Sequence, residues 1–263
     1  MATSVELYQE LAELVKRGER VAVATIIDKK GSAPRRRGAK MLIREGGKIH
    51  GTIGGGIVEA QVISAALLMM KKQSIQTLEF DLNSIQDPDT DLRCGGSMTV
   101  LIEPVIPPNP VVIFGGGHVG FAIYSILTTI DFKVTMVDDR RKFASKKRFP
   151  GAERVICSSY EKAFSRLNID EHTYVVICTR AHKSDEVCLL NALQSPAIYV
   201  GMLGSKSKVA AMKKKMRAAK IPGKRLKDLH APIGLDIGAV TPEEIAVSVA
   251  AEMVRFRSRS LYG

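Results

Sequence analysis

The second half of the chain alternates short apolar runs with helical patterns, and this repetition constrains the fold more than any other feature. The apolar runs are residues 111–114, 133–137, 154–157, 174–179 and 197–203. Runs that are apolar throughout are typical of parallel strands covered on both faces. The repetition therefore predicts a Rossmann-like, doubly wound α/β domain with a parallel sheet.

A proline-rich segment separates this half from the N-terminal half. The segment "PVIPPNP" places four prolines in residues 104–110. Proline fixes φ and removes a backbone donor, so we expect a semi-rigid linker at residues 105–110 between domains 1–104 and 111–263. The first domain is predicted to start with an amphipathic helix whose apolar face includes Val5, Tyr8, Leu11 and Leu14 or Val15. Its strands and its helix at 57–72 fit either an α/β or an α+β fold.

One glycine loop matches the phosphate-binding pattern of dinucleotide-binding folds. In "VVIFGGGHVG" we expect Gly115 to turn tightly, Gly117 to admit a phosphate and Gly120 to let the helix approach the sheet. The next strand ends at Asp138, in the position of an acid that binds a ribose hydroxyl of NAD. The arginine pair at 140–141 keeps NADP as an alternative.

A second set of polar residues follows the fourth predicted strand. His182 and Asp185 are three apart at the start of a helix, where they would orient one another as a base or a ligand clamp. The alternative is that Asp185 occupies the first helical turn, favoured by the helix dipole, while His182 is solvated.

An earlier glycine triplet has a different context. In "GTIGGGIVEA", Gly54, Gly55 and Gly56 precede a helix but follow a predicted hairpin rather than a buried parallel strand. Their amides are suited to an anion. Glu59 would oppose a phosphate there, but it would accept hydrogen bonds from a ring N–H or an amide. Upstream, the arginine-rich turn at 31–38 suits a phosphate or pterin-like anion.

Of the four cysteines, Cys94 has the most unusual setting. It lies in a glycine turn beside an arginine, an electropositive and accessible position that lowers a thiol pKa; the alternative is a structural cysteine beneath a turn. Cys157, Cys178 and Cys188 are expected to be small buried hydrophobes. No spacing typical of a zinc site is present, so no metal site is predicted.

The net charge of +12 arises largely from basic clusters at residues 29–44, 140–148 and 206–227. None carries the interleaved aromatics or motifs of nucleic-acid binding, which leaves a solvated surface, an anionic small ligand or an acidic protein partner. No apolar run approaches the roughly 18 residues of a membrane span, and the N-terminus does not resemble a signal peptide. We therefore expect a cytoplasmic protein without nucleic-acid or membrane partners.

Several motifs together resemble the XdhC/CoxI family of xanthine dehydrogenase accessory factors. They are "GSAPRRRGAKMLI", "GTIGGGIVEA", "CGGSMTVLIEP", "VVIFGGGHVG", "GMLGSKSK" and "GLDIGAVTPEEIAVSVAAE", in the family's order and spanning nearly the whole chain. The resemblance implies an XdhC/CoxI-type N-terminal domain followed by the Rossmann-like domain, in a homodimer. It implies binding of the molybdenum cofactor, which is held during sulfuration and delivered to a xanthine dehydrogenase-type molybdoenzyme. A cysteine desulfurase is a further candidate partner.

The resemblance assigns cofactor contacts to the first glycine loop, Glu59 and Cys94, whereas the ligand of the Rossmann loop is left open. The first hypothesis is therefore a cofactor-insertion chaperone (the molybdopterin form of the cofactor being its ligand) with no catalytic residues of its own. The alternative is an NAD(P)-dependent oxidoreductase that uses the Rossmann loop, with His182 and Asp185 near the substrate. A nucleotide-sensing protein is a third hypothesis.

Overall fold

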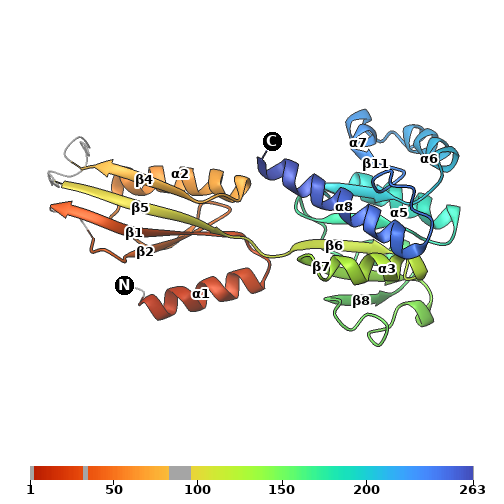
Figure 1. Ribbon diagram of the computed structural model, residues 1–263, viewed down its shortest axis with the longest axis horizontal. Coiled ribbons are helices and arrows are strands. Elements are labelled where there is room, and N and C mark those ends of the chain that lie inside the picture. Colours follow the sequence, from red (N-terminus) through yellow and green to blue (C-terminus); the bar gives the residue numbers. More distant parts are fainter. Residues whose placement is uncertain (1–2, 32–34, 83–95, 263) are drawn as a thin grey trace. The chain divides into compact units, whose positions relative to one another are not determined.

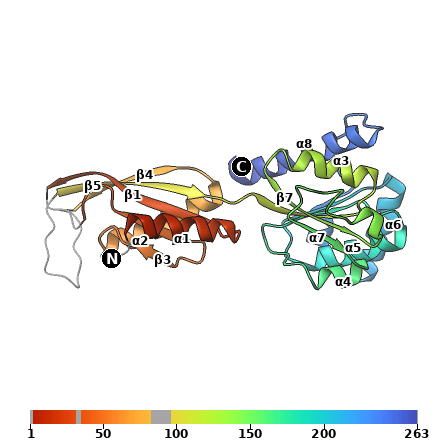
Figure 2. The same cartoon turned by 90° about the horizontal axis from the view of Figure 1, so that it is seen from below.

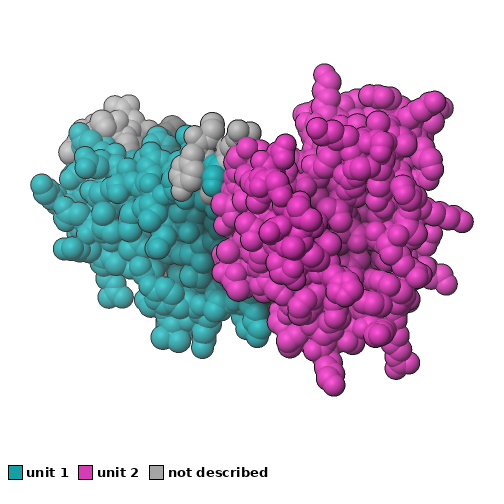
Figure 3. Space-filling view, turned by 45° about the vertical axis from the view of Figure 1, so that its right-hand side comes forward, with its two compact units in different colours: residues 1–107, 258–263 teal, residues 108–257 magenta. Residues whose placement is uncertain are grey.

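The chain divides into two compact units (Figure 3). Unit 1 contains residues 1–107 and 258–263, and unit 2 contains residues 108–257. The computed structural model describes residues 3–31, 35–82 and 96–262, with side chains described as far as residue 258.

Unit 2 is built on a parallel sheet with the strand order β11-β10-β9-β6-β7-β8. This confirms the predicted Rossmann-like fold; the last, two-residue strand was not predicted from the sequence. The strands are β6 (Asn109–Phe114), β7 (Phe132–Asp138), β8 (Arg154–Cys157), β9 (Tyr174–Ile177), β10 (Tyr199–Met202) and β11 (Leu229–His230).

Helices cover both faces of this sheet (Figures 1 and 2). Alternate residues of β6 enter different cores: Val112 and Phe114 pack with one helix layer, Val111 and Ile113 with the other. This double coverage explains why the strands are apolar throughout. One layer contains α3 (His118–Leu127) and α8 (Pro242–Tyr262), and the other contains α4 (Tyr160–Phe164), α5 (His182–Gln194), α6 (Lys206–Ala218) and α7 (Gly223–Lys227).

The strand order reverses between β6 and β9, and this determines where a ligand crevice can form. The chain leaves β6 toward β7 on one side of the sheet, whereas β9 pairs with the opposite side of β6. Such a switch point leaves a crevice at the carboxyl ends of the two strands. Gly115 and Cys178 follow these two ends directly.

Unit 1 contains an antiparallel sheet with the order β3-β2-β1-β5-β4 and one helix on each face. Of the two alternatives for this domain, the structure therefore has the α+β arrangement. The elements are α1 (Ser4–Lys16), β1 (Val21–Gly31), β2 (Lys40–Arg44), β3 (Ile49–Gly51), α2 (Gly56–Lys72), β4 (Gln76–Asp81) and β5 (Gly96–Val105).

The helix α1 buries only part of the predicted apolar face. Leu7 and Leu14 are buried against Val21 and Val23 of β1, whereas Val5 and Tyr8 are exposed. The prediction holds for Leu11 and Leu14 but is wrong for Val5 and Tyr8, because periodicity cannot rank two overlapping apolar stripes.

The proline-rich segment is partly incorporated into strands. β5 continues through Pro104, which pairs with Ala22, and β6 begins at Asn109, so that Pro110 pairs with Lys133. Proline is tolerated near strand ends because its missing N–H interrupts few ladder bonds. Residues 106–108 connect the two strands.

The last helix starts as the sequence predicts. The backbone N–H of Glu244 donates to the Thr241 hydroxyl, and the N–H of Thr241 donates to the Glu244 carboxylate. Thr3 and Glu6 form the same capping box at the start of α1. Each box satisfies two backbone donors that the helix itself leaves unpaired.

One arginine of the basic 206–227 cluster points inward. The Arg225 guanidinium donates to carbonyl oxygens in the last turn of α5 and just beyond it, at 2.9–3.2 Å. A charged side chain that satisfies several helix-end carbonyls fixes α5 to α7. The acceptors are Ala192, Leu193, Ser195 and Ala197.

We expect Arg225→Gln to lower the free energy of unfolding by about 2–4 kcal/mol, because several carbonyls lose their donor. Urea unfolding followed by circular dichroism measures the change. Lys224→Gln is the matched control, since Lys224 is exposed and adjacent. Equal effects of the two substitutions would contradict a capping role for Arg225.

Candidate functional site

The first glycine turn is held by a carboxylate of the helix that follows it. Glu59 Oε1 accepts the backbone N–H groups of Ile53, Gly54 and Gly55 at 2.8–3.1 Å, together with the hydroxyl of Thr52. Gly55 has a φ of 89°, a left-handed conformation that favours glycine. The amides predicted to receive an external anion therefore already contact an internal one.

These hydrogen bonds change the acidity of Glu59. Partial burial raises its pKa, but the hydrogen bonds from Thr52 and the turn amides outweigh burial and hold the pKa below its usual value. Glu59 is thus ionised at neutral pH and stabilises the turn as a carboxylate.

A pocket of about 660 Å³ lies beside this turn within unit 1. Its wall joins the start of α1, the turn that leads into β2, and the end of β3. Four basic side chains line it: Arg35, Arg36, Lys40 and His50. The wall ends at Thr52, whose hydroxyl donates to Glu59, so the arginine-rich turn and the first glycine turn meet at this pocket.

The sequence prediction singled out the glycines and missed most of this pocket wall. Lys40, His50 and Thr52 lie in strands or directly after one, and only the tertiary pairing of β2 with β3 brings them together. The arginine-rich turn was the available signal. Cys94, the predicted thiol of this unit, lies outside the described residues, as do Arg93 and Gly95.

The other cysteines belong to unit 2. Burial raises the pKa of Cys178 to about 12, and the nearby Asp185 and Asp138 carboxylates add to the increase. Burial also raises the pKa of Cys188. Both thiols are therefore protonated at neutral pH. Cys157 is exposed, which corrects the expectation that it is buried; it occupies the solvent-facing position at the end of β8.

The second glycine loop has the tight packing that its motif predicts. A Cβ on Gly120 would lie 1.8 Å from the Gly115 carbonyl oxygen, and one on Gly115 would lie 2.4 Å from the Cys178 carbonyl oxygen. Only glycine allows α3 to approach β6, and β6 to approach β9, this closely. At Gly117, by contrast, a Cβ would meet no atom within 4 Å, so the loop is open at the phosphate position.

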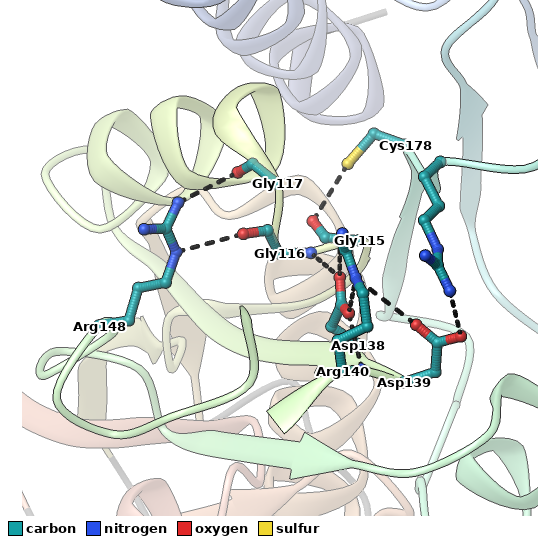
Figure 4. Close-up of polar contacts among 9 residues, drawn as sticks. Gly115, Gly116, Gly117, Asp138, Asp139, Arg140, Arg148 and Cys178 are labelled. Atoms are coloured by element: carbon teal, nitrogen blue, oxygen red, sulfur yellow. Dashed lines mark hydrogen bonds and ion pairs between the residues drawn. The ribbon is translucent and has the colours of Figure 1, made fainter. Parts of the chain in front are cut away.

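Asp138 is occupied by protein donors (Figure 4). One of its carboxylate oxygens accepts the Gly116 N–H at 2.8 Å, and Arg140 binds both oxygens through its side chain. Burial raises the pKa of Asp138, but the hydrogen bonds from Arg140 and Gly116 hold it below its usual value. The carboxylate expected to bind a ribose is 1% exposed and lies beneath Arg140.

A second arginine lies along the same loop and was not singled out from the sequence. Arg148 donates to the Gly116 carbonyl at 3.2 Å (Figure 4). Its guanidinium also lies 4.6 Å from the centre of the Phe121 ring. The Phe143 carbonyl oxygen packs so closely over Gly116 that a Cβ there would approach it to 2.1 Å. The segment between β7 and β8 therefore covers part of the loop.

His182 and Asp185, which were predicted to orient one another, have different surroundings in the structure. Asp185 is fully buried, accepts the Thr179 hydroxyl at 2.7 Å and forms an ion pair with Lys208 at 2.5 Å. His182 is exposed at the start of α5. The arrangement matches the alternative of a first-turn acid beside a solvated histidine. Asp185 and Lys208 join α5 to α6 near the crevice.

Two kinds of feature are absent from the described part of the chain. No helix there is long and apolar enough to cross a membrane. No group of three or more His, Cys, Asp or Glu side chains in the same residues is arranged to hold a metal ion.

Comparison with protein families covers both units. The description "XdhC Rossmann domain" matches residues 111–253, and "XdhC and CoxI family" matches residues 14–81. The chain belongs to the XdhC and CoxI family. The first match contains the Rossmann loop, and the second contains the glycine turn, Glu59 and most of the basic pocket wall.

Three relatives share parts or all of this sequence. An Escherichia coli K12 protein named YqeB, described as uncharacterized, is 31% identical over 97% of this chain, which spans about half (47%) of that protein. A Bacillus subtilis 168 protein, described as a probable component of xanthine dehydrogenase, is 23% identical over 95% of this chain and 97% of its own. The molybdenum cofactor insertion chaperone PaoD of Escherichia coli K12 is 30% identical over 38% of this chain and 31% of its own.

One solved structure has the same fold. It is described as a xanthine dehydrogenase from Bacillus halodurans and aligns with a TM-score of 0.52 at 24% identity. The alignment covers 98% of this chain and 97% of the other. The two-unit architecture is therefore shared by a solved protein.

We expect Glu59→Gln to lower the free energy of unfolding by about 1–2 kcal/mol at pH 7, because the turn amides lose a charged acceptor. The folded-state pKa of Glu59 is lowered, so its contribution is present above the usual value of 4.5 and is lost as pH falls through the folded-state value. The difference between the two proteins should therefore shrink below about pH 4.5.

Urea unfolding between pH 3 and pH 8 measures this difference. Glu79→Gln, which removes an exposed carboxylate on β4, is the control and should change stability little at any pH. A Glu59→Gln effect that does not depend on pH would contradict the role of the ionised carboxylate.

Proposed function

We propose that this protein binds the molybdenum cofactor and assists its sulfuration and its insertion into a xanthine dehydrogenase-type molybdoenzyme. The observation that carries the proposal is family membership across both units, together with a relative described as a molybdenum cofactor insertion chaperone. In this function the protein is an accessory factor that holds and transfers a ligand.

The residues of unit 1 fit such a ligand. Molybdopterin is anionic, and the basic side chains beside the glycine turn form a pocket of suitable charge and of a size common for small-molecule sites. We assign cofactor binding to this pocket, to the adjacent turn of Gly54, Gly55 and Gly56, and to Cys94 as the thiol. When bound, the cofactor supplies a molybdenum centre that receives a terminal sulfur.

Within this proposal Glu59 is a positioning residue. Its carboxylate fixes the conformation of the glycine turn through three backbone N–H groups, and it holds the hydroxyl of Thr52 at the pocket wall. A turn that is rigid before binding reduces the entropy lost when a ligand is ordered.

The Rossmann loop of unit 2 is proposed as the second anion site. Gly117 leaves its backbone open, and Gly115 and Gly120 allow the close packing that places the start of α3 at the crevice. The ligand there is either a dinucleotide or the phosphate end of the pterin. A cytoplasmic homodimer, the recipient molybdoenzyme and a cysteine desulfurase as sulfur donor complete the proposal.

An NAD(P)-dependent oxidoreductase is the alternative, and the geometry supports it less well. Arg140 and Gly116 already bind both oxygens of Asp138, the expected ribose acceptor. His182 is exposed, and Asp185 contacts Thr179 and Lys208 rather than the histidine. Among the described residues, His182 and Asp185 therefore do not form the acid–base pair that an oxidoreductase substrate would need at this crevice.

We expect the wild-type protein, purified anaerobically from cells that make the cofactor, to release molybdopterin on denaturation. Cys94→Ala should retain at least about tenfold less, because the thiol facing the cofactor is lost. Cofactor per protein is measured by the fluorescence of the oxidised pterin after release.

Cys157→Ala is the matched control, since Cys157 is an exposed cysteine of the other unit. It should retain the wild-type amount. Absence of pterin from the wild-type protein, combined with oxidation of NADH by a small carbonyl compound, would overturn the chaperone proposal in favour of the oxidoreductase.

We also expect Gly117→Val to abolish binding of any nucleotide to unit 2 while the protein stays folded. The side chain would enter the open space that a phosphate needs, without meeting protein atoms near its Cβ. Titration with NADH and NADPH by calorimetry, alongside thermal unfolding, measures both effects. Unchanged nucleotide affinity in the variant would show that the loop has only a packing role.

A further inference from the structure

The pocket of unit 1 has a charge pattern that selects a particular chemical group. Its described lining contains four basic side chains, those of Arg35, Arg36, Lys40 and His50, but no Asp or Glu. Basic side chains from separate segments that surround a hollow of about 660 Å³ produce a focused positive potential. The pocket is therefore suited to a compact dianion.

Contacts within the protein position one of the cationic side chains, that of Lys40. Lys40 donates to the Thr25 hydroxyl at 2.9 Å, across the β1–β2 pair, and its ammonium group lies 5.9 Å from the centre of the Tyr8 ring. Arg36 and His50 are exposed and reach the same hollow from different segments. One fixed cation and two adaptable ones can surround a tetrahedral oxyanion from several sides.

Two acidic side chains near the pocket, Glu6 and Glu59, already accept hydrogen bonds from other groups of the protein. The Glu6 carboxylate accepts the Thr3 N–H at 2.7 Å in the capping box of α1. Glu59, beyond Thr52, is bound by three turn amides and the Thr52 hydroxyl. Neither carboxylate belongs to the pocket lining. Among the described lining residues, no carboxylate is therefore present to repel a bound anion.

We propose that this pocket is a phosphate-monoester site, with Arg36, Lys40 and His50 as its cationic contacts, and that it receives the phosphate end of the cofactor. The second part rests on the proposed function. The site lies next to the glycine turn but does not use the turn amides, which belong to Glu59. It divides unit 1 into an anion-binding pocket and a neighbouring rigid turn.

The test uses the ¹⁵N-labelled 263-residue chain and inorganic phosphate as the probe, at pH 7.5 and constant ionic strength. We expect saturable shifts of the backbone amide signals around Gly38–Lys40 and Gly51–Thr52. Arg36→Gln combined with Lys40→Gln should weaken phosphate binding at least about tenfold, because two charge-assisted contacts are lost. Lys71→Gln with Lys72→Gln, exposed at the end of α2, removes the same charge elsewhere and should leave the affinity unchanged.

Because Lys40 also contacts Thr25, a second variant avoids a folding defect. Arg36→Gln combined with His50→Gln changes only exposed side chains and should weaken phosphate binding several-fold. Shifts spread evenly over the protein, or equal affinity in both pocket variants and the control, would overturn the proposal.

A parallel titration separates this inference from the proposed function. Molybdopterin and its dephosphorylated form are compared by pterin fluorescence, and the pocket variants should lose affinity only for the phosphorylated form. If both forms bind the wild-type protein equally, the pocket assignment fails while cofactor binding stands. If neither form binds but inorganic phosphate does, the proposed function fails and the phosphate site stands.

Discussion

Backbone N–H groups in a tight glycine turn need acceptors, and in both units a carboxylate of the chain supplies them. Glu59 accepts three N–H groups of the first turn, and Asp138 accepts the Gly116 N–H of the second. Each carboxylate comes from the element that the turn must face: α2 in unit 1 and β7 in unit 2. The turns are consequently rigid without a ligand, and the positions of α2 and α3 on their sheets depend on them.

These internal hydrogen bonds limit the places at which the protein can bind an anion. Amides already bound to a carboxylate are poor sites for a second negative group, so recognition depends on side-chain cations and on the positions left open, such as Gly117. The basic clusters of the sequence divide accordingly. One lines the pocket of unit 1, and one surrounds the Rossmann loop through Arg140 and Arg148. The third uses Arg225 to cap a helix and Lys208 to pair with Asp185.

Elements defined by local patterns could be predicted from the sequence. The apolar strands of unit 2, the Thr241 capping box and the spacing of Gly115, Gly117 and Gly120 depend on neighbours in the chain. Features that depend on distant partners could not. Periodicity did not identify β11, whose two residues pair with β10, or the hydrogen bond that the Gly116 N–H donates to Asp138. The residues of the pocket wall could be identified only once the β2–β3 register was known. The hydrogen bonds of Glu59 likewise depend on how its turn folds, and the sequence indicated only that its charge would repel a phosphate bound there.

The hydroxyl of Thr52 has a single proton, which it donates to Glu59 while accepting the Gly54 N–H. Because Thr52 also lines the basic pocket, an anion there would compete with Glu59 for that proton. Filling the pocket therefore weakens the hold of Glu59 on the turn, and by the same thermodynamic linkage a tighter turn weakens the pocket's hold on its anion. Anything that tightens the turn from outside would therefore favour release of the anion, so release need not require a separate moving lid.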